Sequence, residues 1–172
     1  MSKNKLKPQG KKSLARLRGT KQPGRRILIV TEGETEKAYF DAIRKQWKLY
    51  TVVVVINPDC TDPVSLFNRA KEKNRDKGIL EGSYDAVWLV YDLEKPNSTD
   101  RRCQSQFVKD KITGKKYTNF HLAISDPSFE FWYVLHFDKT TKSFTGADEV
   151  VKHLKKYWSS YGKGTLSDEE FK

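Results

Sequence analysis

The 172-residue chain is poor in cysteine and contains no long apolar run. Its two cysteines, Cys60 and Cys103, form neither a metal-binding nor a redox motif, so a disulfide-stabilised scaffold or a cysteine-ligated metal centre has no support. No stretch has the length of a membrane span and no signal-peptide pattern is present, so we expect a cytoplasmic protein without a membrane partner. The glycines form no GxGxxG or GK[ST] motif, which removes support for a nucleotide-binding phosphate loop.

Residues 1–26 contain no acidic residue but carry ten Lys and Arg. The other 23 basic residues of the chain stand against all 22 Asp and Glu, so residues 27–172 have a net charge of only +1. A block of like charge interrupted by Pro and Gly is typical of a tail that is disordered when free. The tail is either a phosphate-binding arm or a solvated segment without a ligand. The residues expected to contact nucleic acid are Lys11, Lys12, Arg16, Arg18, Arg25 and Arg26.

Residues 27–172 alternate between short apolar runs and helical patterns, which predicts a single α/β domain. Strands are expected at 27–31, 51–56, 86–91 and 120–124, and helices at about 35–48, 62–78 and 146–160. Residues 95–118 are polar and weakly periodic, so we predict a long loop with at most a short helix. Ser128 is expected to open a deeply buried aromatic helix, and Trp88, Phe131 and Trp132 are expected in the core. Ser167 and Glu170 form a capping box for a helix with no room to form, which suggests a C-terminally truncated domain.

Acidic residues follow three of the expected strands. Glu32 ends the first strand and Glu36 lies in the helix after it, Asp92 and Glu94 end the third strand, and Glu130 follows the fourth. The carboxyl ends of parallel strands share one edge of a sheet, where ligands bind. Clustered carboxylates need a cation to stay ionised together, and Mg²⁺ or Mn²⁺ is the hard, oxygen-seeking partner that phosphodiester chemistry uses. The alternative without a ligand is that Glu32 and Glu36 stabilise a helix N-terminus, where negative charge is favoured by about 0.3–1 kcal/mol.

Three motifs together resemble a known fold. Glu32-Gly33-x-x-Glu36, the DxD-like Asp92-x-Glu94 and Ser128-x-Glu130 are similar to the Toprim domain shared by topoisomerases, primases and a class of metal-dependent nucleases. More closely, ILIVTEGETEKAYF, YDAVWLVYDLE and SDPSFEFWYVLHF resemble the RloB family of small Toprim-like proteins, which are associated with bacterial restriction and anti-phage loci. The resemblance implies a Toprim-like (Rossmann-like) fold, with a mostly parallel sheet of about four strands flanked by helices.

The resemblance also implies roles for individual residues. Glu32 would be the general base or a metal ligand, and Ser128 would support catalysis. The implied metal ligands are Glu36, Asp92, Glu94 and Glu130. Two positions depart from the family pattern: Glu94 is one methylene longer than the second Asp of a DxD motif, and Asp126 stands where the family usually has asparagine. Both departures bear on rate and metal preference.

Three functions remain open on this reading. The first is a two-metal nuclease of an anti-phage defence system that acts on DNA or RNA, with a second protein of the defence complex as a further candidate partner. The second is a Toprim-like module that binds nucleic acid or a partner without turnover. The third is an aspartyl phosphatase, which would need a nucleophilic Asp where this chain has Glu32.

The basic tail generates a test of its own. Each phosphate that a protein neutralises contributes about −0.9 to the slope of log affinity against log salt on duplex DNA. If half of the tail charges engage, deleting residues 1–24 should flatten that slope by roughly 3 to 5. The measurement is nucleic-acid affinity across a salt series for the full chain and the deletion. An unchanged slope would show that the tail does not contact phosphates.

Overall fold

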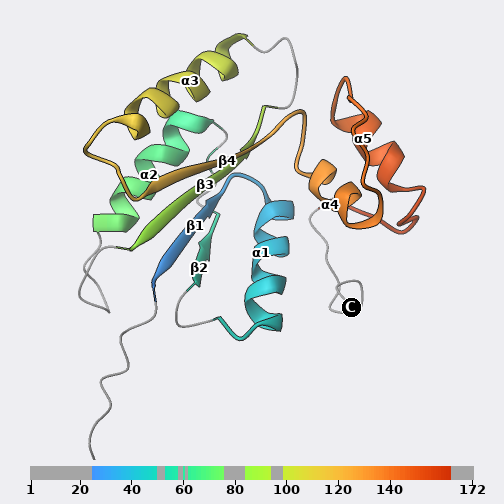
Figure 1. Cartoon of the computed structure of the whole chain (residues 1–172), viewed down its shortest axis with the longest axis horizontal. Coiled ribbons are helices and arrows are strands. Elements are labelled where there is room, and N and C mark those ends of the chain that lie inside the picture. Colours follow the sequence, from blue (N-terminus) through green and yellow to red (C-terminus); the bar gives the residue numbers. More distant parts are fainter. Residues whose placement is uncertain are drawn as a thin grey trace, which may run out of the picture.

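A computed structural model describes residues 25–49, 53–57, 60, 62–75, 84–93 and 99–163 of the chain. Strands alternate with helices through these ranges (Figure 1). In chain order the elements are β1 (Ile27–Thr31), α1 (Glu34–Gln46), β2 (Val53–Ile56), α2 (Pro63–Arg75), β3 (Ala86–Asp92), α3 (Thr99–Thr113), β4 (Phe120–Ser125), α4 (Glu130–Phe137) and α5 (Ala147–Leu154). None of the described helices is long and apolar enough to span a lipid bilayer.

The four strands form one parallel sheet in the order β2-β1-β3-β4. This arrangement confirms the predicted α/β class, and it is compatible with a Rossmann-like or Toprim-like fold. The chain leaves β1 toward β2 on one side and later returns to place β3 on the other side, so the strand order reverses between β1 and β3. In open α/β sheets, ligands bind outside the carboxyl ends of the strands at such a switch point. Glu32 and Asp92 stand at these two strand ends.

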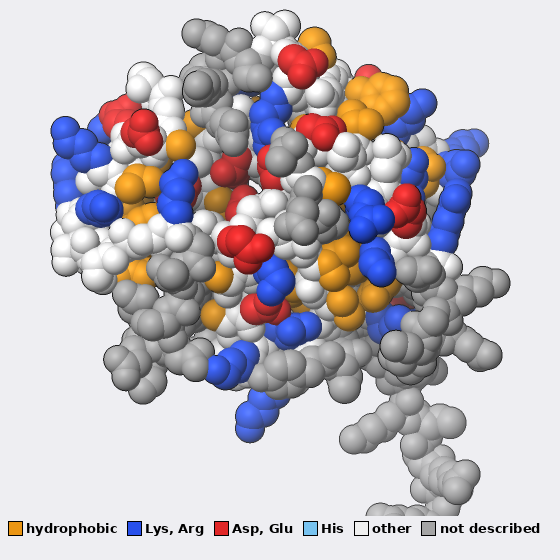
Figure 2. Space-filling view, turned by 180° about the vertical axis from the view of Figure 1, so that it is seen from behind, with side chains coloured by type: hydrophobic (Ala, Val, Ile, Leu, Met, Phe, Trp, Pro, Cys, Tyr) orange, Lys and Arg blue, Asp and Glu red, His pale blue; other side chains and the backbone are white. Residues whose placement is uncertain are grey.

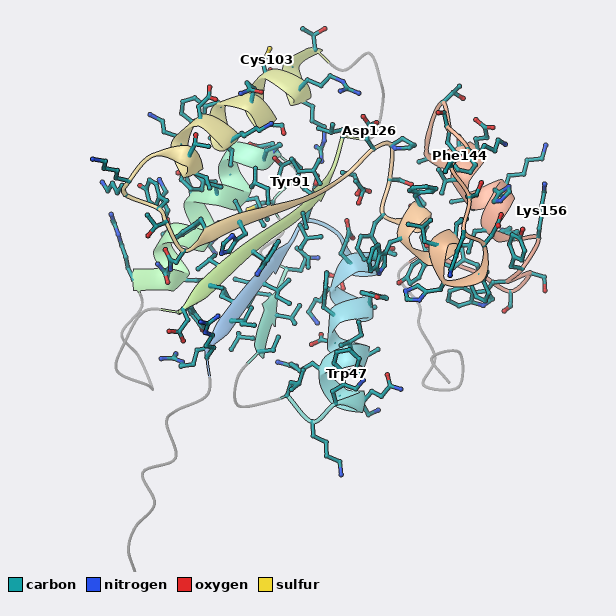
Figure 3. All side chains as sticks on the ribbon, viewed as in Figure 1. Trp47, Tyr91, Cys103, Asp126, Phe144 and Lys156 are labelled. Carbon is teal, nitrogen blue, oxygen red and sulfur yellow. The ribbon has the colours of Figure 1, made fainter. Side chains whose placement is uncertain are left out.

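The two faces of the sheet are covered differently. Because side chains alternate along a strand, Leu28 and Val30 of β1 point to one face, where α2 and α3 cover them. On the other face, Val90 of β3 joins a second core with α1, α4 and α5. Tyr91, labelled in Figure 3, lies between the sheet and α3. Its hydroxyl is 2.8 Å from the Ser105 hydroxyl of that helix.

The polar stretch after β3 is a helix, so the predicted long loop was wrong. Helix α3 covers 15 residues, yet only Ser105 and Val108 among them are buried. So narrow an apolar stripe produces almost no helical periodicity in the sequence, which is why the pattern suggested a loop. Tertiary packing against α2 and the sheet stabilises this helix, although its sequence has little helical periodicity.

Two other expectations about burial were also wrong. Helix α4 is eight residues long and only partly buried, with Trp132 47 % exposed. Trp88 is 37 % exposed and stacks on His121 of β4, with 4.7 Å between the ring centres. Both tryptophans line an apolar groove of about 410 Å³ beside α1. The sheet face over β3 and β4 is therefore more open than a fully buried parallel sheet.

Two neighbouring positions on α3 test its packing. Val108→Ala should lower the free energy of unfolding by roughly 1–3 kcal/mol, because the Val108 side chain is completely buried. Phe107→Ala should cost less than about 1 kcal/mol, because Phe107 is largely exposed. Urea unfolding of both variants measures the difference. Equal, small effects would contradict the packing of α3 against the sheet.

Candidate functional site

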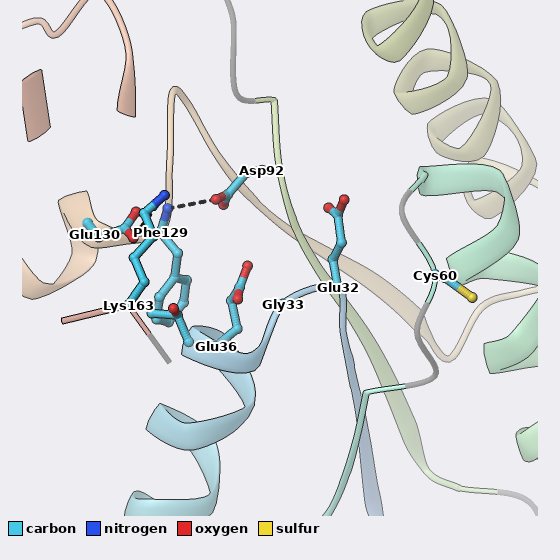
Figure 4. Close-up of a pocket in the computed structure, with 9 residues that line it drawn as sticks. Glu32, Gly33, Glu36, Cys60, Asp92, Phe129, Glu130 and Lys163 are labelled. Carbon is cyan, nitrogen blue, oxygen red and sulfur yellow. Dashed lines mark hydrogen bonds and ion pairs between the residues drawn. The ribbon is translucent and has the colours of Figure 1, made fainter. Parts of the chain in front are cut away.

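A cavity of about 300 Å³ opens at the carboxyl edge of the sheet, at the switch point between β1 and β3. Four acidic residues from three strand-to-helix connections line it: Glu32, Glu36, Asp92 and Glu130. Figure 4 shows these side chains at the ends of β1 and β3 and at the starts of α1 and α4. Acidic side chains also lie at the bottom of a hollow on the face drawn in Figure 2. The structure thus brings four of the five predicted acids into one cavity, while their roles stay predictions.

Glu32 follows the last residue of β1, and its backbone N–H donates to the Val90 carbonyl oxygen of β3 at 3.0 Å. Its carboxylate forms an ion pair with the guanidinium of Arg101 from α3. The same guanidinium donates through Nε to the backbone oxygen of Asp92. Arg101 therefore ties the ends of β1 and β3 together across the switch point.

Glu36 lies in the first turn of α1 and is only 5 % exposed. Its carboxyl group folds back over the turn at Gly33, into the space that the Cβ of any other residue would fill. Burial is the main reason that the pKa of Glu36 rises to about 7, and the nearby charges of Glu32 and Glu130 raise it further. Glu36 is consequently a carboxyl group that takes up and releases its proton near neutral pH.

Asp92 ends β3 and faces the start of α4. Its Oδ2 accepts a hydrogen bond from the Phe129 backbone N–H at 3.1 Å, whereas its buried Oδ1 has no hydrogen-bond partner among the described residues. Burial raises the pKa of Asp92 to about 8, with Glu36 adding the next largest contribution. A buried oxygen without a donor is costly, and it is an available ligand position for a cation.

Glu130 begins α4 and is 3 % exposed. Its Oε1 accepts a hydrogen bond from the Tyr161 hydroxyl at 3.0 Å and lies 3.7 Å from Lys163 Nζ. Burial and the neighbouring Glu130 charge raise the pKa of Tyr161, so this phenol remains a neutral donor. Tyr161 and Lys163, like Arg101, escaped the sequence analysis. For Arg101 the available sequence signal was the group of seven Lys and Arg between residues 95 and 118, which does not single out one of them.

Ser128 lies beside the acidic cavity and does not line it. The Ser128 side chain is buried, and its hydroxyl has no hydrogen-bond partner within the described part of the chain. It lines a neighbouring pocket of about 540 Å³, which shares Asp92 and Lys163 with the acidic cavity. The predicted supporting role of Ser128 stays a prediction.

The remaining predicted site residues are either outside the described ranges or away from the cavity. Glu94 falls outside the described residues, as do Lys11, Lys12, Arg16 and Arg18. Arg26 precedes β1, at the amino edge of the sheet and opposite the acids, where its backbone N–H donates to Asp85 and its guanidinium lies over Tyr84. Arg25 is exposed next to it. These two arginines therefore belong to a different edge from the acidic cavity.

The donor set suits a hard divalent cation, although the acids do not converge on one point. No group of three or more acid, His or Cys side chains in the described ranges is placed to hold a metal ion. Glu32 and Glu130 each have a cation beside them, and the two acids between them have raised pKa values. The cluster is thus neutralised by its own basic residues and by protons. Carboxylate oxygens, including the orphaned Asp92 Oδ1, are the ligands that Mg²⁺ and Mn²⁺ prefer.

The raised pKa values make stability depend on pH. Between about pH 4 and 8 the folded protein keeps protons on Glu36 and Asp92 that the unfolded chain has released, so stability should fall as pH rises. Asp92→Asn removes one of these groups and lessens the repulsion on Glu36, so the fall should become shallower. Melting curves in EDTA between about pH 5 and 8 measure both. Asp110→Asn, at an exposed position on α3, is the control that should retain the wild-type slope; an Asp92→Asn curve as steep as wild type would contradict the assignment.

Comparison with known proteins places this geometry in a family. The profile of the family described as RloB-like protein matches residues 27–172, which is the α/β region and excludes the basic tail. No curated protein and no solved structure matches the chain. The matched region contains every described strand and helix and all four acids of the cavity. The chain belongs to the RloB-like protein family.

Proposed function

We propose that this protein is a divalent-metal-dependent nuclease of a bacterial anti-phage defence system that hydrolyses the phosphodiesters of DNA or RNA. The observation that carries the proposal is the cavity at the β1–β3 switch point, into which three separate strand-to-helix connections deliver four acids. A fold tolerates buried, mutually repelling carboxyl groups at a cost in stability, and such clusters concentrate where chemistry needs them. The defence role rests on the resemblance to RloB proteins alone.

The proposed ligands of Mg²⁺ or Mn²⁺ are Glu36, Asp92 and Glu130, joined by Glu94 beyond the described residues. Bound there, the cation would supply Lewis-acid stabilisation of phosphate oxygens and a water of lowered pKa. The chain's own groups have separate tasks. Glu32 is the acid nearest a permanent cation, Arg101, and is the proposed general base or additional ligand. The Phe129 N–H and the Tyr161 hydroxyl orient Asp92 and Glu130.

Nucleic acid is the proposed partner of both the basic tail and the acidic cavity. The basic tail would hold the phosphate backbone without reading sequence, while the acidic cavity would act on one phosphodiester. Arg25 and Arg26 lie at the amino edge of the sheet, whereas the acidic cavity lies at the carboxyl edge. For the tail and the cavity to contact the same nucleic-acid molecule, either the tail or the nucleic acid must therefore extend from one edge to the other. A second protein of the defence system could occupy either surface.

One observation favours the second candidate, a module that binds without turnover. The acids are not arranged as three or more converging ligands within the described ranges, and Arg101 and Lys163 already neutralise two of them. A cavity held together by its own cations has no need of a metal. The choice between the two candidates therefore depends on whether a divalent cation enters.

The test combines metal binding with cleavage. Purified protein is incubated with labelled single- and double-stranded DNA and RNA in Mg²⁺, Mn²⁺ or EDTA, and its melting temperature is followed across a metal titration. We expect metal-dependent cleavage and a rise in melting temperature, because a ligand that binds only the folded state stabilises it. Asp92→Asn and Glu130→Gln should each abolish cleavage and the metal-induced rise, since they remove a ligand charge at nearly constant volume.

Asp110→Asn serves as the matched control, because it removes an exposed carboxylate away from the cavity. It should leave both readouts unchanged. Cleavage that survives Asp92→Asn and Glu130→Gln would overturn the proposed centre. Wild-type protein that binds nucleic acid, ignores millimolar metal and never cleaves would establish the binding module instead.

A further inference from the structure

Arg101 of α3 forms an ion pair with Glu32, one of the four acids that line the cavity. Its side chain is 11 % exposed and that of its partner Glu32 is 15 % exposed, so the pair is almost removed from water. The neighbouring Arg102 pairs with Asp126 at the surface, where the two side chains are 41 % and 49 % exposed. The ion pair of Arg101 is therefore nearly buried beside the proposed site, whereas the ion pair of Arg102 with Asp126 is exposed to solvent.

An arginine at this position acts as a permanent cation. Its guanidinium does not deprotonate in proteins, and its fixed fork of N–H groups matches a carboxylate. Arg101 uses that fork to reach the Glu32 carboxylate and, through Nε, the Asp92 backbone oxygen. It therefore occupies the corner where the two strands of the switch point end, which is also the corner where a divalent cation would meet Glu32.

We propose that Arg101 competes with divalent cations for Glu32 and thereby sets the metal affinity of the site. This inference rests on the proposed metal-dependent function. A dication approaching Glu32 meets the positive guanidinium at close range, in a cavity where the low dielectric strengthens repulsion. To bind there it must also release Glu32 from the ion pair. The metal-free arrangement is consequently stabilised by the same residue that weakens metal binding.

The alternative is that Arg101 positions Glu32 for the metal. An ion pair between nearly buried groups can hold a ligand in the orientation that coordination needs. The two roles predict opposite signs for one measurement. Removing Arg101 should tighten metal binding if it competes, and should weaken metal binding if it positions.

The experiment is a calorimetric titration of the metal-free full chain with Mn²⁺ alone, without nucleic acid. For Arg101→Gln, which keeps hydrogen-bond donors and loses the charge, we expect roughly tenfold tighter Mn²⁺ binding than wild type. Arg102→Gln removes the same charge one residue along and should leave the affinity within about twofold of wild type. Glu32→Gln supplies the second arm of a double-mutant cycle: in its presence Arg101→Gln should tighten Mn²⁺ binding by a clearly smaller factor, because only the direct repulsion of the cation is then removed.

The metal-free Arg101→Gln protein should also melt below wild type, because it removes the cation that pairs with the nearly buried Glu32 charge. If that variant fails to fold, Arg101→Lys decides, since it keeps the charge but loses the fork and should bind Mn²⁺ tighter than wild type by a smaller factor. Unchanged or weaker binding in whichever variant folds would overturn the competition while leaving the metal site in place. No Mn²⁺ binding by wild type or any variant would overturn the competition and the proposed function together.

Discussion

The mutual repulsion of four carboxyl groups in one small cavity is the constraint on which the site depends. Three features reduce that repulsion. Arg101 pairs with Glu32 at one end of the cluster and Lys163 lies beside Glu130 at the other. The raised pKa values of Glu36 and Asp92 favour protons on the two acids between them. A cluster of this kind costs stability wherever it lacks a cation. Under the proposed function, this cost in stability would be the counterpart of catalytic activity.

The fold concentrates the acids because parallel strands all present their carboxyl ends at the same edge. The order β2-β1-β3-β4 then separates the helices that follow β1 and β3, which leaves room between them for a cavity. Glycine at position 33 lets the Glu36 carboxyl group turn back into that room. Helices α4 and α5 close one side through the core that they share with α1 and β3, and α3 closes the other side with Arg101.

Much of this could be predicted from local sequence, because the signals involved are local. Four short apolar runs, each followed by a turn or helix signal, were enough for the parallel α/β class, and acids placed directly after strands were enough for an acidic edge. The predictions that were wrong also have a common cause. Helix α3 has too narrow an apolar stripe to read as a helix, and Trp88 and Trp132 stand in apolar runs although their faces are open. Periodicity reports the average environment of an element and not the exposure of one side chain.

The sequence by itself determined the strands, their carboxyl-end acids and the RloB-like motifs, since these depend on residues close together in the chain. Only the tertiary structure decided which groups share the cavity and in what charge state. Arg101 reaches Glu32 across 69 residues and Tyr161 reaches Glu130 across 31, so no spacing rule could have paired them. The raised pKa values of Glu36 and Asp92 likewise follow from burial and from one another's charge. Both are properties of the folded molecule, because desolvation and Coulomb energy depend on distances that the chain acquires only on folding.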